Sequence, residues 1–228
     1  MTLALLHTSP AHIPVFDALR DADHPGLALR HLVREDLLAR ARAEGPDAVA
    51  DAVREALAEA ADGADAVLCT CSTIGGVAEA HAAAKGVPVL RVDRPMAADA
   101  VRAGPAVAVV ATVASTLEPT VALVREEADR AGRAVDIRTV LVDGAWERFE
   151  AGDRAGYLGR VADAVERVAG SVGAVLLAQA SMAEAADRAP AGTPVLSSPR
   201  TGLREAALLC GHTAPEPAAV PRTDHPQA

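Results

Sequence analysis

Short apolar runs alternate along the chain with longer segments in which apolar residues recur at helical spacing. Continuous apolar runs of about four to eight residues are typical of strands buried on both faces of a sheet. They predict strands over Leu3–Leu6, Leu27–Val33, Ala66–Cys71, Val87–Val92, Ala106–Ala111, Val135–Val142, Ala174–Ala178 and Pro194–Ser197. The helical spacing predicts helices over Pro46–Ala61, Ile74–Lys85, Leu117–Ala131, Tyr157–Ala169, Met182–Arg188 and Gly202–Leu209.

Strands that alternate with helices in this way predict an α/β fold with parallel sheets covered on both faces. The eight strands fall into two groups of four that separate near Val92–Gly104. We therefore expect two similar lobes with a cleft between them. The segment 212–228 carries four prolines and little apolar content, which predicts a flexible C-terminal tail.

Composition narrows the class of protein. Half of the 228 residues are hydrophobic, enough for a core, and the formal net charge is −9. An acidic chain has no general attraction for phosphate backbones or anionic lipid, so we expect no nucleic-acid and no membrane partner. The N-terminus lacks the basic and apolar regions of a secretory signal, and three cysteines do not form a disulfide framework. We expect a reduced, cytoplasmic protein.

Ligands of open parallel sheets bind at the carboxyl ends of the strands, so the residues just after each strand are candidates for the site. Small hydroxyl residues recur there, and they are good donors to a small anion. The candidates are His7, Thr8 and Ser9; Cys71, Ser72 and Thr73; Thr112, Ser115 and Thr116; Gln179, Ala180 and Ser181; and Ser198, Arg200 and Thr201.

Cys71 is the most specific of these features. It stands where a predicted strand turns into a helix, and a helix N-terminus stabilises a thiolate. Gly75 and Gly76 then follow, and we expect them to let the backbone approach the ligand closely. Cys69 and Cys210 are expected to pack in the core.

The remaining motifs suggest little other chemistry. His7, at a strand end, is a weak candidate acid or base, whereas His31 is expected in the core or at its rim. The chain has neither a dinucleotide fingerprint nor a Walker A sequence, and its histidines show no metal-ligand spacing. Trp146, Phe149 and Tyr157 lie close together in sequence and could cap the cleft.

Several segments together resemble the aspartate/glutamate racemase superfamily. Residues 65–73 (DAVLCTCST) resemble its first cysteine motif, in which a strand delivers Cys-Asn-Thr or Cys-Ser-Thr. Residues 91–96 (RVDRPM), 109–120 (VVATVASTLEPT) and 175–182 (VLLAQASM) also resemble segments of this superfamily, in the same order. The likeness covers most of the chain.

The resemblance implies two pseudo-symmetric lobes, each a four-stranded parallel sheet flanked by helices, with the active site in the cleft between them. We assign 1–95 plus 200–211 to the first lobe and 96–199 to the second. It also implies no metal, no pyridoxal phosphate or other cofactor, a small carboxylate substrate and a possible homo-oligomer. Substrate-binding groups carried over from the family fall on Thr8, Ser9, Ser72, Thr73, Thr112, Ser115, Thr116, Gln179, Ala180 and Ser181.

One position departs from the family pattern. Racemases of this kind use two cysteines on opposite faces of the substrate carbon, and the second of them falls on Gln179 here, with its Thr-His followers on Ala180 and Ser181. Glutamine cannot exchange protons near neutral pH, although its amide could donate to an anion. Ser181 without a neighbouring base would be a poor replacement.

Four functions therefore remain open. The first is a cofactor-independent racemase or isomerase that transfers a proton next to a carboxylate through Cys71 and a second, unidentified group. The second is a lyase such as a decarboxylase, with Cys71 as the only proton donor, which the glutamine favours. The third is a non-catalytic protein that binds small acids. The fourth is a cysteine hydrolase, which requires a histidine beside Cys71; His7 qualifies only if the first and third strands are neighbours.

Overall fold

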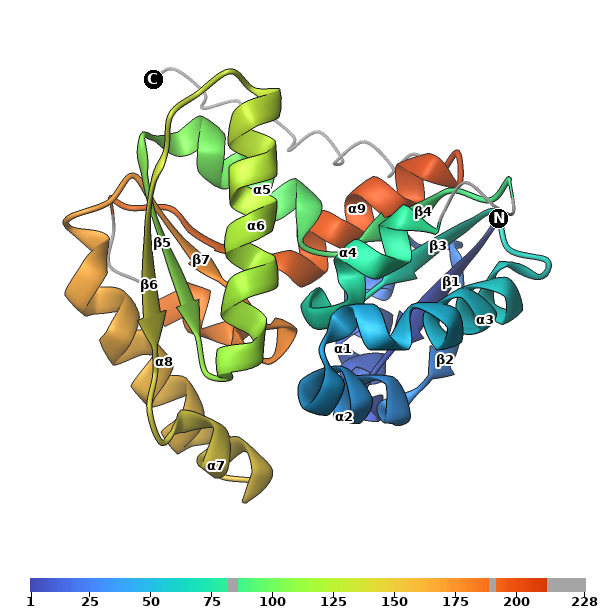
Figure 1. Ribbon diagram of the computed structural model, residues 1–228, viewed down its shortest axis with the longest axis horizontal. Helices are drawn as coiled ribbons and strands as arrows, with labels where there is room; N and C mark the ends of the chain where they lie inside the picture. Colours follow the sequence, from blue (N-terminus) through green and yellow to red (C-terminus); the bar gives the residue numbers. More distant parts are fainter. Residues whose placement is uncertain (82–85, 189–191, 213–228) are drawn as a thin grey trace, which may run out of the picture.

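The computed structural model describes residues 1–81, 86–188 and 192–212 and contains two four-stranded parallel sheets (Figure 1). The first sheet has the order β2-β1-β3-β4 and the second the order β6-β5-β7-β8. The strands are β1 (Thr2–His7), β2 (Ala28–Val33), β3 (Ala66–Cys69), β4 (Val89–Arg91), β5 (Ala106–Ala111), β6 (Asp136–Leu141), β7 (Ala174–Leu177) and β8 (Val195–Ser197). The predicted α/β class with two similar parallel sheets is confirmed. The tail expected over 212–228 lies outside the described residues, except for His212.

Helices cover both sheets, and the apolar pattern missed several of them, two of which bury few residues. The helices are α1 (Ile13–Asp23), α2 (Glu35–Glu44), α3 (Ala50–Ala61), α4 (Ser72–Ala80), α5 (Arg94–Ala103), α6 (Ala114–Arg130), α7 (Ala145–Glu150), α8 (Arg154–Ala169) and α9 (Ser198–Leu209). In α1 only Phe16 is fully buried, and in α2 only Leu37 and Ala41 are. So few buried positions leave a weak helical period in the sequence.

Two other segments differ from the predictions. The segment predicted as a helix over Met182–Arg188 lies in a 3₁₀ helix, η4 (Ala180–Arg188). The helix predicted from Pro46 begins with a 3₁₀ turn, η2 (Pro46–Val49), before α3. Among the described residues, no helix has the length and apolar character needed to cross a bilayer.

Two helices connect the lobes. Each follows a strand of one sheet but packs against the other sheet. We call each sheet, with the helices packed on it, a lobe. α5 follows β4 of the first sheet, yet Met96 and Ala100 pack in the core of the second lobe. α9 follows β8 of the second sheet, yet Leu203 and Ala206 pack in the core of the first lobe. The helices α4, α5, α6 and α9 consequently lie between the two sheets (Figure 1). The residue boundaries predicted for the lobes stay a prediction.

Candidate active site

A small pocket lies between the lobes, at the carboxyl ends of the central strands. Its volume of about 80 Å³ suits a small molecule. The first lobe contributes Thr8, Ser9, His12, Leu38, Arg42, Thr70, Cys71, Ser72 and Thr73, and the second contributes Thr116, Trp146, Phe149, Ala178, Gln179, Ala180 and Ser181. Of Cys71 and the ten binding residues carried over from the family, nine therefore line one pocket: Thr8, Ser9, Cys71, Ser72, Thr73, Thr116, Gln179, Ala180 and Ser181.

Cys71 stands at the centre of this arrangement. It is the N-cap residue of α4, with extended backbone (φ −109°, ψ 115°), and its side chain is half-buried. Its thiol thus lies at the positive end of the helix, where an anion is favoured. The neighbouring Ser72 hydroxyl donates a hydrogen bond of 3.1 Å to the Ala178 carbonyl of the other lobe, which fixes this turn across the cleft.

Cys69 has a different environment, as its predicted place in the core suggests. Its side chain is fully buried, and this burial raises the pKa of its thiol. Its sulfur lies 3.8 Å from the Cys71 carbonyl oxygen.

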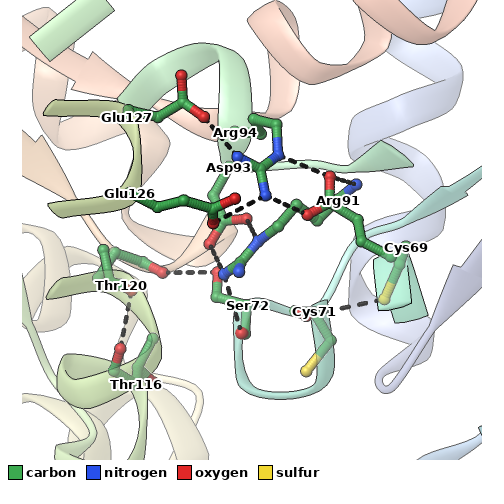
Figure 2. Close-up of polar contacts among 12 residues, drawn as sticks. Cys69, Cys71, Ser72, Arg91, Asp93, Arg94, Thr116, Thr120, Glu126 and Glu127 are labelled. Carbon is green, nitrogen blue, oxygen red and sulfur yellow. Dashed lines mark hydrogen bonds and ion pairs between the residues drawn. The ribbon is translucent and has the colours of Figure 1, made fainter. Parts of the chain in front are cut away.

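A buried ion pair supports the Cys71 turn and gives the two glycines a structural role. Arg91 makes hydrogen bonds of 2.7 and 3.0 Å to the two carboxylate oxygens of Asp93, and it also lies 3.4 Å from the Ser72 carbonyl (Figure 2). A Cβ atom at Gly75 would be 3.1 Å from Arg91 Cβ and Nε, and one at Gly76 would be 3.4 Å from Arg91 Nη1. The glycines thus make room for Arg91; the expectation that they let the backbone approach a ligand closely stays a prediction.

The second lobe presents Gln179 to the pocket in a fixed orientation. Its Oε1 accepts hydrogen bonds from the Thr112 backbone N–H (2.7 Å) and hydroxyl (3.0 Å). Because the carbonyl is occupied, the Nε2 amide is the group left to donate to a ligand. Behind it, the buried Tyr157 hydroxyl lies 2.8 Å from Ser181 Oγ and 3.5 Å from Thr112 Oγ1. Burial raises the pKa of Tyr157, so this phenol stays protonated.

Two of these eleven residues, Thr112 and Ser115, are not part of the pocket wall, and neither are the further strand-end candidates His7, Ser198, Arg200 and Thr201. Thr112 acts one layer behind it, through Gln179. The Ser115 hydroxyl, in the first turn of α6, is buried and has no hydrogen-bond partner among the described residues.

The outer wall of the pocket contains residues that sequence reasoning largely missed. The Arg42 guanidinium lies over the Trp146 ring, 5.4 Å from its centroid, and joins the two lobes. Trp146 stacks on Phe149 with centroids 4.9 Å apart. The clustering of aromatic residues in the sequence was a usable signal for Trp146 and Phe149, but Arg42 and Leu38 lie on a helix that reads as a solvated surface.

The amino-acid sequence matches the model of a known protein family. The model described as Asp/Glu/Hydantoin racemase matches residues 9–206. The chain belongs to the Asp/Glu/hydantoin racemase family. No curated protein sequence matches it significantly.

Solved structures with the same fold include members of this racemase family. Allantoin racemase from Pseudomonas fluorescens is 18% identical, with 100% of both chains covered and a TM-score of 0.66. Aspartate racemase from Picrophilus torridus is 14% identical, and the match covers 94% of this chain and 96% of the racemase chain with a TM-score of 0.68. A glycine-to-cysteine mutant of arylmalonate decarboxylase is 22% identical, with coverages of 94% and 96% and a TM-score of 0.65. At these identities the likeness shows the fold.

The structure shows which side chains His7 contacts. β1 and β3 are neighbours in the sheet. This arrangement was required for His7 to act as the histidine beside Cys71 in a cysteine hydrolase. However, His7 Nδ1 lies 2.8 Å from the Thr70 hydroxyl and His7 Nε2 lies 2.8 Å from His31 Nδ1, so both ring nitrogens already have partners. Thr70 was missed because it falls inside a predicted strand. Within the described residues, no cluster of three or more His, Cys, Asp or Glu side chains could hold a metal.

Proposed function

We propose that this protein catalyses proton transfer at the carbon next to the carboxylate of a small acid or amino acid, without a cofactor, through the Cys71 thiolate. The observation that carries the proposal is the position of Cys71. Its thiol lines a small pocket between the lobes at a helix N-terminus, among hydroxyl and amide groups from both lobes. Family membership supports the reaction class.

The chemistry follows from these groups. A thiolate removes the proton from the carbon next to the carboxylate, and the electron pair left behind spreads into the carboxylate as an enediolate. Donors aimed at the developing charge lower this barrier most. Thr73, Thr116 and the Nε2 amide of Gln179 line the pocket and are suited to that role, together with the free N–H groups at the start of α4.

A lyase reaction is the second candidate, and Gln179 is the observation that favours it. Racemisation needs a second group that delivers a proton to the opposite face of the carbon, and an amide cannot do so near neutral pH. Loss of CO₂ creates the carbanion without any base, so one thiol that donates its proton is enough. The arylmalonate decarboxylase among the similar structures has the same fold.

The test is deuterium exchange. We would incubate the reduced protein in D₂O with L-aspartate, L-glutamate, allantoin and phenylmalonate, and follow the α-proton signal by NMR, CO₂ release and optical rotation. Cys71→Ser should abolish turnover, since a serine hydroxyl without a base is a poor proton carrier. Cys210→Ser is the matched control: it removes another thiol, at the C-terminal end of α9 and outside the pocket wall.

The outcomes separate the candidates. Exchange with loss of optical activity, absent only in Cys71→Ser, supports a racemase. Release of CO₂ with one deuteron delivered supports the lyase. Turnover that persists in Cys71→Ser contradicts the role of this thiol. Absence of turnover with every acid would argue against proton-transfer chemistry on this panel and would direct attention to binding.

A further inference from the structure

A line of hydrogen-bonded side chains crosses the first lobe from the pocket wall to the surface. Thr70 lines the pocket, and its hydroxyl lies 2.8 Å from His7 Nδ1. His7 Nε2 lies 2.8 Å from His31 Nδ1, and His31 Nε2 lies 3.3 Å from Asp17 Oδ1. The strand order β2-β1-β3 places Thr70, His7 and His31 side by side, and α1 brings Asp17 over them. The line starts at the residue before Cys71.

Two protonation states satisfy every member of this line. In the neutral state, His31 Nε2–H donates to Asp17, and His7 Nε2–H donates to His31 Nδ1. Thr70 then donates its hydroxyl proton to His7 Nδ1. With one proton more, both nitrogens of His31 donate, and His7 accepts at Nε2 and donates from Nδ1 to Thr70. The Thr70 hydroxyl then donates to the Leu6 carbonyl, 3.2 Å away. The two states differ by one proton and by a reversal of every inner hydrogen bond.

The environment of each histidine decides where the extra proton resides. His7 is completely buried; burial, with the neighbouring His31 and His12, lowers its pKa to about 3. It therefore keeps one ring proton near neutral pH and passes a proton without storing it. His31 Nε2 lies 3.3 Å from Asp17 Oδ1, so the line ends at a carboxylate. The other charged or titratable neighbours are His12, 6.4 Å from His7 between ring centroids, and Arg20, 3.7 Å from Asp17.

We propose that Thr70, His7 and His31 form a proton relay that reprotonates the Cys71 thiolate from the solvent side of the first lobe. The inference rests on the second candidate of the proposed function, the lyase reaction, in which Cys71 gives its proton to the substrate. Gln179, which faces the pocket from the other lobe, cannot return that proton. The line approaches the pocket from within the first lobe and ends at Thr70, which lines the pocket beside Cys71.

Each relay step balances. The Thr70 hydroxyl proton moves to the Cys71 sulfur, directly or through one pocket water, and forms the S–H bond. Thr70 oxygen takes the Nδ1 proton of His7, and His7 Nε2 takes the Nδ1 proton of His31. His31 becomes neutral and regains a proton from solvent beside Asp17. The net change is one proton moved from solvent to the thiolate.

Nitrogen NMR tests the relay without any substrate. Long-range ¹H–¹⁵N spectra of the wild-type protein should show the His7 ring proton on Nε2 when His31 is neutral. As acidification protonates His31, the His7 proton should move to Nδ1. Thr70→Val removes the acceptor for that proton and should suppress the switch, whereas Thr73→Val, a neighbouring pocket threonine outside the line, should leave it intact. A His7 proton that keeps its position while His31 titrates would overturn the relay.

Kinetics provide a second, independent readout on an acid of the panel that the wild type turns over. His31→Gln and Asp17→Asn should slow deuterium delivery by on the order of 10- to 100-fold. A plot of rate against the deuterium fraction of the solvent should be curved for the wild type, because several protons move, and linear for these variants. Asp21→Asn is the matched control, because Asp21 lies on the same helix and also pairs with Arg20. If both variants fold and keep the wild-type rate and solvent-deuterium dependence, the hydrogen-bonded side chains have only a structural role.

The two proposals fail differently. Turnover that depends on Cys71, without the tautomer switch or any effect of His31→Gln, rejects the relay alone. A tautomer switch in a protein that turns over none of the panel acids supports the proton path and counts against the proposed reaction.

Discussion

At the scale of single residues, His7 shows how a fold fixes a charge state. The side chain is wholly excluded from solvent, and both ring nitrogens are hydrogen-bonded. A free histidine has a pKa of 6.5, and the fold lowers the pKa of His7 to about 3. Between these values the unfolded chain binds a proton that the folded protein does not.

This difference predicts acid sensitivity. The stability contributed by neutral His7 is fully present above pH 6.5 and is lost as the pH falls toward 3, at about 1.4 kcal/mol per unit of pKa difference. His7→Gln keeps a polar side chain but does not titrate, so its free energy of unfolding should fall less between pH 7 and pH 4. Urea unfolding at several pH values measures this. Parallel pH curves for the two proteins would contradict the assignment.

At the scale of elements, close backbone contacts position the helices against the strand ends. Gly202 on α9 lies so near the end of β4 that a Cβ atom would be 2.5 Å from the Val92 carbonyl oxygen and 2.6 Å from Val92 Cγ2. A backbone atom cannot move aside cheaply. α9 therefore packs on the first sheet only with a glycine at this position.

We accordingly predict opposite effects for two glycine substitutions in helices. Gly202→Ala should lower the free energy of unfolding by about 1–3 kcal/mol, the usual cost of overpacking. Gly159→Ala in α8 meets no atom within 4 Å and should raise it by about 0.5–1 kcal/mol through lower chain entropy. Denaturant unfolding of both variants is the measurement. A neutral Gly202→Ala would show that α9 can shift freely.

At the scale of the whole molecule, Arg94 on α5 joins helices from both lobes. It forms an ion pair with Glu79 on α4 of the first lobe. It also forms ion pairs with Glu126 and Glu127 on α6 of the second lobe (Figure 2). Arg94 and Glu79 are each only 17% exposed. Partial burial weakens solvent screening, so this pair should contribute more than a surface ion pair.

A double-mutant cycle tests this connection. The coupling free energy between Arg94→Ala and Glu79→Ala should be about 1 kcal/mol or more. The Arg102–Asp99 pair within α5 is the control, because its arginine is 65% exposed and helix-surface pairs three or four residues apart contribute about 0.2–0.5 kcal/mol. Chemical unfolding of the four proteins in each cycle provides the numbers. Equal coupling in both cycles would contradict a special role for Arg94 between the lobes.

Much of the site could be predicted because strand ends are local features. An apolar run followed by small polar residues identifies the carboxyl end of a buried strand, and parallel sheets bring those ends to one edge. Cys71, Thr8 and Gln179 line the pocket for this reason. Thr112, just after β5, and Ser115, in α6, satisfied the same pattern, but the orientation of their side chains depends on how α6 packs.

The sequence by itself determined the parallel α/β architecture, the two groups of four strands and the cysteine at the third strand end. Each of these features follows from short apolar runs and from the residues directly after them. Only the tertiary structure decided which distant side chains meet. His7 contacts Thr70 across 63 positions and His31 across 24, because the strand order β2-β1-β3 makes them neighbours. Arg91 fills the space beside Gly75, and Arg42 covers Trp146 across the cleft. Such contacts depend on strand order and helix packing, which local sequence patterns do not specify.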